Sequence, residues 1–165
     1  SLFFISLLNL AACGGGGGGS TTPPSAGCSP STTNLCITVV GGKYVVQNSS
    51  SAGVSQKTLT LNAGTYTFDQ TDSSNVTPAG AYGSARIHQI GFSTTSDGTF
   101  GGGSTYSTGV NTSGSPGSNG KTTIVIDAST PSTLYYYCVN HTGMGGTINI
   151  VIGNQSEQVE FTETN

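Results

Sequence analysis

Charged side chains are scarce in this sequence. Asp, Glu, Lys and Arg make up only 7% of its 165 residues, and four basic residues against seven acidic ones give a formal net charge of -3. Nucleic-acid binding needs a positive surface that faces the phosphates, and four basic side chains do not supply one. We therefore expect no nucleic-acid partner.

Helical patterning is nearly absent as well. Leucine, alanine, glutamate and lysine do not recur with the spacing of an amphipathic helix. The chain instead has 26 glycines, seven tyrosines and abundant serine and threonine. This composition favours short strands joined by turns, so the sequence predicts an all-β fold.

Familiar catalytic motifs are also missing. The sequence contains no recognisable Ser-His-Asp set, no HExxH motif and no phosphate-binding glycine motif. Asp69, Asp72 and Asp97 lack the spacing of a calcium-binding EF-hand, and we expect them to cap turns or lie in solvated loops. The sequence therefore predicts that the protein is not an enzyme.

The N-terminus is typical of an export signal. Residues 2–10, LFFISLLNL, form an apolar run that is too short to span a bilayer, and LAAC follows at residues 10–13. Small residues before a cysteine resemble the lipobox of bacterial lipoproteins, which implies lipidation of Cys13. The alternative is a buried strand followed by an ordinary cysteine. The resemblance predicts an exported lipoprotein, periplasmic or on the cell surface, which its lipid anchors to a bacterial membrane. The predicted divisions are a removed signal (1–12), the lipidated cysteine with a Gly/Ser/Pro tether (13–27) and one folded domain (28–165).

The remaining three cysteines present a pairing question. Disulfides persist in exported proteins, and Cys28 and Cys36 are close enough in sequence to close a small loop. Cys138 is then left unpaired, which is unusual outside the cell and suggests a chemical role. The alternative is that Cys138 pairs with Cys28 or Cys36.

Alternating apolar residues predict a series of strands that form a two-sheet sandwich. The turn Gly41-Gly42 is suited to a hairpin, and the glycine-rich residues 96–120 are expected to form a long excursion with a short strand near 104–110. The predicted strands are 36–40, 43–47, two within 57–70, 86–95, 121–127, 132–138 and 146–152, with 157–163 as a possible edge strand.

Residues 135–146, YYYCVNHTGMGG, place Cys138, His141 and the single methionine, Met144, within seven positions. This motif, between an aromatic strand and the alternating GTINIVI, resembles the C-terminal copper-binding loop of the cupredoxins, or blue copper proteins. The resemblance implies a Greek-key β-sandwich of about seven to nine strands. It also implies that His88, the only other histidine, completes the ligand set. Segment 77–85, before His88, is an insertion relative to that family.

These residue types suit copper on chemical grounds. Cu(I) favours soft sulfur and Cu(II) favours imidazole nitrogen, so a site that holds both needs a compromise set such as two histidines, one thiolate and a weak thioether. With its ligands on one short loop and a neighbouring strand, such a site changes little when an electron arrives. The sequence thus predicts an electron-transfer protein with one copper per chain and a redox protein as its partner. The alternatives are copper storage or delivery, and a metal-free sandwich used in adhesion or assembly.

His141 is expected to be the exposed ligand and the point at which electrons enter. Its neighbours in sequence are small and uncharged, with no lysine or arginine among them. We therefore expect partner docking through apolar contact, with little dependence on salt.

Overall fold

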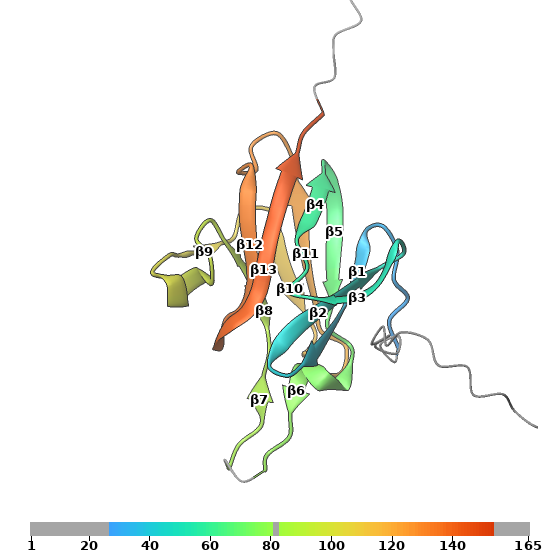
Figure 1. Ribbon diagram of the computed structural model, residues 1–165, viewed down its shortest axis with the longest axis vertical. Helices are drawn as coiled ribbons and strands as arrows, with labels where there is room; N and C mark the ends of the chain where they lie inside the picture. The colour runs from blue at the N-terminus through green and yellow to red at the C-terminus, as the bar shows by residue number, and fades with distance from the viewer. Residues whose placement is uncertain (1–26, 81–82, 154–165) are drawn as a thin grey trace, which may run out of the picture.

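The computed structural model describes residues 27–80 and 83–153, which form an all-β sandwich (Figure 1). These ranges contain thirteen strands and two short 3-10 helices, so the strands are more numerous than the predicted seven to nine. None of their helices is long and apolar enough to cross a membrane. The elements are β1 (Asn34–Val40), β2 (Lys43–Asn48), β3 (Ser51–Ser55), β4 (Leu59–Asn62), β5 (Gly64–Asp69), η1 (Ser73–Asn75), β6 (Val76–Thr77), β7 (Arg86–Ile87), β8 (Ile90–Ser93), η2 (Gly98–Gly101), β9 (Thr105–Tyr106), β10 (Val110–Ser113), β11 (Lys121–Ile126), β12 (Thr133–Cys138) and β13 (His141–Val151).

Two mixed sheets make up the sandwich. The first has the order β10-β11-β5-β1-β2-β3 and the second the order β4-β13-β12-β8-β9. Each sheet contains one parallel pair, β1 with β5 and β4 with β13, and its other pairs are antiparallel. Strands β6 and β7 form a separate hairpin that projects from one end of the molecule (Figure 1).

The core lies between the two sheets. Phe68 of β5 packs edge-on against Phe92 of β8, with ring centroids 5.1 Å apart, and Tyr136 of β12 lies 6.1 Å from Phe68. Burial of such large apolar side chains is the main force that holds two sheets together. The other large, almost fully buried side chains of this core are Leu35, Ile37, Tyr44, Ile90, Ile124, Ile126, Leu134 and Ile148.

The predicted hairpin at Gly41-Gly42 is confirmed. Both glycines have positive φ, 57° and 73°, and the β1–β2 ladder closes with Val40 opposite Lys43. Glycine adopts this left-handed conformation without a steric penalty, which is why the sequence marks the turn so clearly. The hairpin brings Val39 and Gly42 to the end of the sandwich that carries the candidate site.

Several strands differ from the sequence prediction. The predicted strand 86–95 is divided into β7 and β8, and β6 and β10 were not expected. Strand β3 was not expected, because SAGVS has neither apolar alternation nor bulk, and it forms by pairing with β2 at the sheet edge. Strand β13 begins at His141 rather than near residue 146, since Cys138 pairs with His141 across the turn. Its glycine-rich start is therefore held by its partner strand and not by its own β-propensity.

The acidic residues have more specific roles than the sequence suggested. Asp72 caps η1 by accepting a hydrogen bond from the Ser74 amide at 2.9 Å, as expected for a turn cap. Asp69 accepts a hydrogen bond from the Thr71 amide at 3.0 Å, which confirms the expected cap, but it also ends β5, is 2% exposed and forms an ion pair with Lys121 at 2.7 Å. Burial made this pairing necessary, because an unpaired buried carboxylate is costly.

Several predictions fall on residues outside the described ranges. These are the signal segment 1–12, Cys13, nearly all of the tether 13–27 and the edge strand 157–163. They remain predictions from the sequence.

Candidate metal centre

Three strand ends bring the candidate ligands together. Cys138 is the last residue of β12, His141 the first of β13, and His88 lies between β7 and β8. Since Cys138 pairs with Ile90 of β8, the residue two positions before Ile90 lies beside the end of β12. The fold thus places His88 next to a cysteine that is fifty positions away in sequence.

The nitrogen and sulfur atoms of these side chains are spaced for a metal ion. Cys138 Sγ lies 3.4 Å from His141 Nδ1 and 4.0 Å from His88 Nδ1, and the ligand atoms of the three residues all lie within 4.8 Å of one another. An ion about 2.0–2.3 Å from each ligand in a trigonal arrangement needs ligand atoms roughly 3.5–4 Å apart. The cluster therefore fits a metal ion with little movement, and it is the one such group in the described part of the chain.

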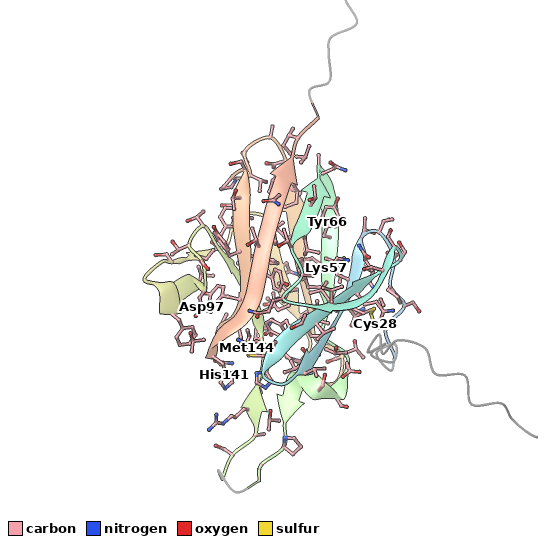
Figure 2. The ribbon with its side chains drawn as sticks, viewed as in Figure 1. Cys28, Lys57, Tyr66, Asp97, His141 and Met144 are labelled. Atoms are coloured by element: carbon pink, nitrogen blue, oxygen red, sulfur yellow. A yellow bond between two sulfur atoms is a disulfide. The ribbon has the colours of Figure 1, made fainter. Side chains whose placement is uncertain are left out.

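Met144 lies close to this cluster. It is 2% exposed and lines the same cavity as His88 and His141, which has a volume of about 290 Å³. Figure 2 shows Met144 and His141 at the same end of the sandwich, where β13 begins. The structure thus gathers all four predicted site residues, His88, Cys138, His141 and Met144, at one place.

Cys138 is a free thiol with no exposed surface, while Cys28 and Cys36 form a disulfide. The alternative in which Cys138 pairs with one of them is wrong in this structure. A buried free cysteine next to two imidazoles has the soft sulfur that copper and zinc prefer.

His88 is held by hydrogen bonds that leave its Nδ1 facing the cluster. Its Nε2 lies 3.1 Å from the Thr77 hydroxyl, and its backbone N–H donates to Asn75 at 2.9 Å. Its carbonyl accepts from the Tyr44 hydroxyl at 2.9 Å and from the Gln70 amide at 2.5 Å. Metal-binding histidines are typically oriented in this way by a partner on the second ring nitrogen.

The environment of His88 favours its neutral form. Burial lowers the pKa of its imidazole, and the nearby His141 and Arg86 lower this pKa further. Because only a neutral imidazole binds a metal, the fold keeps His88 in the form that a metal requires.

The two histidines differ in exposure. His88 is 6% exposed, whereas His141 is half-buried and therefore the more accessible of the pair. The exposed large apolar residues of the protein include Val40, Ile87 and Val139. The backbone at Ile87 is held by Asn140, of the turn after β12, which donates a hydrogen bond to the Ile87 carbonyl at 2.8 Å.

The expected uncharged neighbourhood of His141 is wrong. Arg86 lines the cavity beside His141, and Lys43 donates a hydrogen bond to the Gly143 carbonyl. Both basic residues are far from His141 in sequence, so inspection of its sequence neighbours missed them. The expectation of a salt-independent association rate loses its basis, because half of the four basic residues in the chain lie at this site.

Asp97 has a role at the site that the sequence did not indicate. It was expected in an ordinary solvated loop, but its carboxylate accepts hydrogen bonds from the Thr142 hydroxyl and the Gly143 amide. Gln56 donates to the carbonyls of Gly143 and Gly145. Nothing in the local sequence marks either residue, because these contacts join segments 45 or more positions apart.

Comparison with known proteins does not assign the chain to a family. No protein-family model matches the chain, and no curated protein matches it in sequence.

Proposed function

We propose that the protein is a copper-binding electron-transfer protein of the cupredoxin type. The observation that carries the proposal is the free thiol of Cys138, fully buried, within 4.0 Å of a ring nitrogen of both His88 and His141. The buried Met144 thioether beside them distinguishes this set from a typical structural zinc site, whose ligands are cysteine, histidine and carboxylate.

The side chains have distinct tasks in this function. When bound, copper would supply a one-electron couple between Cu(I) and Cu(II). Cys138 offers a thiolate from the rigid end of β12, and His88 offers Nδ1 while Thr77 holds Nε2. His141 offers a ring that also lines the cavity, which gives a partner protein a short path to the cluster.

The proposal also includes attachment to a membrane and a redox partner. Lipidation at Cys13 would tether the domain to a bacterial membrane through the glycine-rich segment that follows. The partner is a redox protein that docks over the cavity beside His141. Arg86 lies at that cavity, so docking is expected to respond to salt.

The test is the addition of one equivalent of Cu(II) to the purified full chain, wild type and Cys138→Ser. The wild type is expected to gain an intense visible band from thiolate-to-copper charge transfer and to be reduced reversibly by one electron. Cys138→Ser is expected to lose the band, because serine has no sulfur that could donate charge.

A matched control is Cys28→Ser with Cys36→Ser, which removes sulfur from the chain but leaves the cluster intact and should keep the band. Stoichiometric copper binding without the visible band would overturn electron transfer in favour of copper storage or delivery. Failure to bind copper at all would favour a metal-free sandwich.

A further inference from the structure

We call residues 141–144, the start of β13 where Gly143 has a positive φ of 70°, the His141–Met144 turn. Between these two candidate ligands lie only Thr142 and Gly143, and one carboxylate binds both of them. The Gly143 amide donates to Asp97 Oδ1 at 2.8 Å, and the Thr142 hydroxyl donates to Asp97 Oδ2. Asp97 comes from the loop after β8, in the glycine-rich excursion. The backbone between the two candidate ligands is therefore held from outside its own strand.

The same turn is held from a second side. Gln56 Nε2 donates to the carbonyl of Gly145 at 2.7 Å and to that of Gly143 at 3.2 Å. Lys43 Nζ also donates to the Gly143 carbonyl. Both polar backbone groups of Gly143 are thus bound by side chains from other segments, and Figure 2 shows Asp97 beside the start of β13.

An independent backbone feature points to the same two residues. Across residues 27–80 and 83–153, the non-glycine residues with positive φ are Gln56 at 47° and Asp97 at 58°. A left-handed conformation costs free energy for residues that have a Cβ, less for Asp than for Gln, and it persists where the surrounding structure uses it. Both residues bind the turn that carries His141 and Met144.

We infer that Asp97 and Gln56 are positioning residues that hold the His141–Met144 turn in its metal-binding shape before a metal arrives. The inference rests on the proposed function for the identity of the metal. The two side chains act through the backbone of the turn and touch no ligand atom in the described contacts. Their effect is to fix the distance between the imidazole of His141 and the thioether of Met144.

Asp97→Gly and Gln56→Gly separate positioning from general stabilisation. Glycine removes the side-chain hydrogen bonds but adopts positive φ without strain, so the relief of strain, larger at Gln56 than at Asp97, offsets part of the stability that the lost contacts supplied. If Asp97 and Gln56 position the ligands, replacing them will then change the properties of the metal site more than it changes the stability of the fold. Asp97→Asn is the conservative variant, since asparagine tolerates the left-handed conformation and keeps an acceptor for the Gly143 amide.

The first readout needs no metal. Hydrogen exchange of the Gly143 amide in the copper-free protein should become faster in Asp97→Gly and change less in Asp97→Asn, because that amide loses its acceptor in the first variant only. Asp127→Ala is the matched control. Asp127 Oδ1 also accepts from a backbone N–H and a hydroxyl, both of Ser129 at 2.8 and 2.6 Å, but it lies in the turn after β11. This control should leave Gly143 exchange unchanged.

The second readout uses copper. Loss of Cu(I) to a chelator should be about 10-fold faster in Asp97→Gly and in Gln56→Gly, as is typical when partners of the ligand shell are removed. The reduction potential should also shift, because a looser turn changes how closely Met144 approaches the metal. Asp97→Asn should restore most of the wild-type behaviour, and Asp127→Ala should show none of these changes.

Wild-type exchange at Gly143 in Asp97→Gly, or an unchanged potential and copper-loss rate in both glycine variants, would overturn the inference. A loss of stability without any change at the site would overturn it as well, since that outcome describes a purely structural role. If the wild type binds no copper, the proposed function fails, while the exchange of Gly143 in the metal-free protein still decides whether Asp97 holds the turn.

Discussion

Gly98 allows the loop that carries Asp97 to lie flat on Tyr137, the residue before Cys138. A Cβ at position 98 would lie 2.4 Å from two atoms of the Tyr137 ring. The ring has no room to move away, because it is 1% exposed, its hydroxyl is bonded to Thr105 at 2.8 Å, and its edge is close to Gly91. Gly98→Ala must therefore shift the loop, the ring or both.

The cost of Gly98→Ala has two parts. The φ of 56° at this position penalises alanine by about 1–2 kcal/mol. Overpacking against a ring that is fixed on several sides adds about 1–3 kcal/mol. The free energy of unfolding should fall by about 2–5 kcal/mol, and urea denaturation measures this directly when the slope of the transition is unchanged.

Gly102→Ala is the matched control in the same loop. Gly102 also has positive φ, 82°, but a Cβ there would meet nothing within 4 Å. Only the conformational penalty of about 1–2 kcal/mol applies. The free energies of unfolding of the two variants should therefore differ by about 1–3 kcal/mol, and their urea midpoints by on the order of 1 M. Equal losses in the two variants would refute the claim that the loop is packed against Tyr137.

Two further predictions concern single hydrogen-bonding partners. Thr77→Val removes the hydroxyl that lies 3.1 Å from His88 Nε2 and should weaken copper binding by about 10-fold in a chelator competition; unchanged affinity would contradict this role. Burial raises the pKa of the Asp69 carboxyl, but hydrogen bonds, chiefly from Lys121, outweigh burial and hold this pKa below its ordinary value. The stability that ionised Asp69 contributes is then present above its unfolded pKa of about 3.9 and is lost as the pH falls through the lower folded value. Lys121→Met should therefore move the acid-unfolding midpoint, followed by circular dichroism, to higher pH, and an unchanged midpoint would contradict the assignment.

The parts of the fold that the sequence predicts well are those with a local physical signal. The hairpin at Gly41-Gly42 follows from two residues that adopt positive φ without cost. Strands β4 and β11 were predicted from their sequences, and the structure shows the alternating burial expected of strands with one face on the core. The Cys138–Met144 segment is equally local, because its three candidate ligands lie within seven residues and a turn between paired strands brings them together.

The parts that the sequence did not predict depend on distant pairing. Strand β3 has no pattern of its own and exists because β2 offers it an edge. The early start of β13 runs through glycines, which have low β-propensity, and it is the partner strand β12 that keeps this segment extended. In both cases tertiary hydrogen bonding overrides the local preference of the residues.

The support of the candidate site shows the same division between local and distant information. The ligand turn is local, but the groups that hold it or the His88 ring come from distant segments that no pattern in the sequence marks, and these groups include Gln56 and Lys43. Thr77 lies on β6 and Arg86 on β7, and Asp97 lies in the glycine-rich excursion. The side chains of Thr77, Arg86 and Asp97 lie outside the buried apolar cluster, although Tyr106 and Val110 of the glycine-rich excursion pack against it.

This separation has a consequence for how the site can be tuned. A substitution at Thr77 alters one hydrogen bond to the imidazole, and a substitution at Asp97 alters two hydrogen bonds to the turn, while the packing between the two sheets is untouched. A substitution at Tyr136 or Phe92 instead disturbs the core and changes the site only as a by-product of lost stability. Under the proposed function, the affinity and the potential of the centre can therefore vary through the Thr77 and Asp97 side chains at little cost to the packing between the sheets.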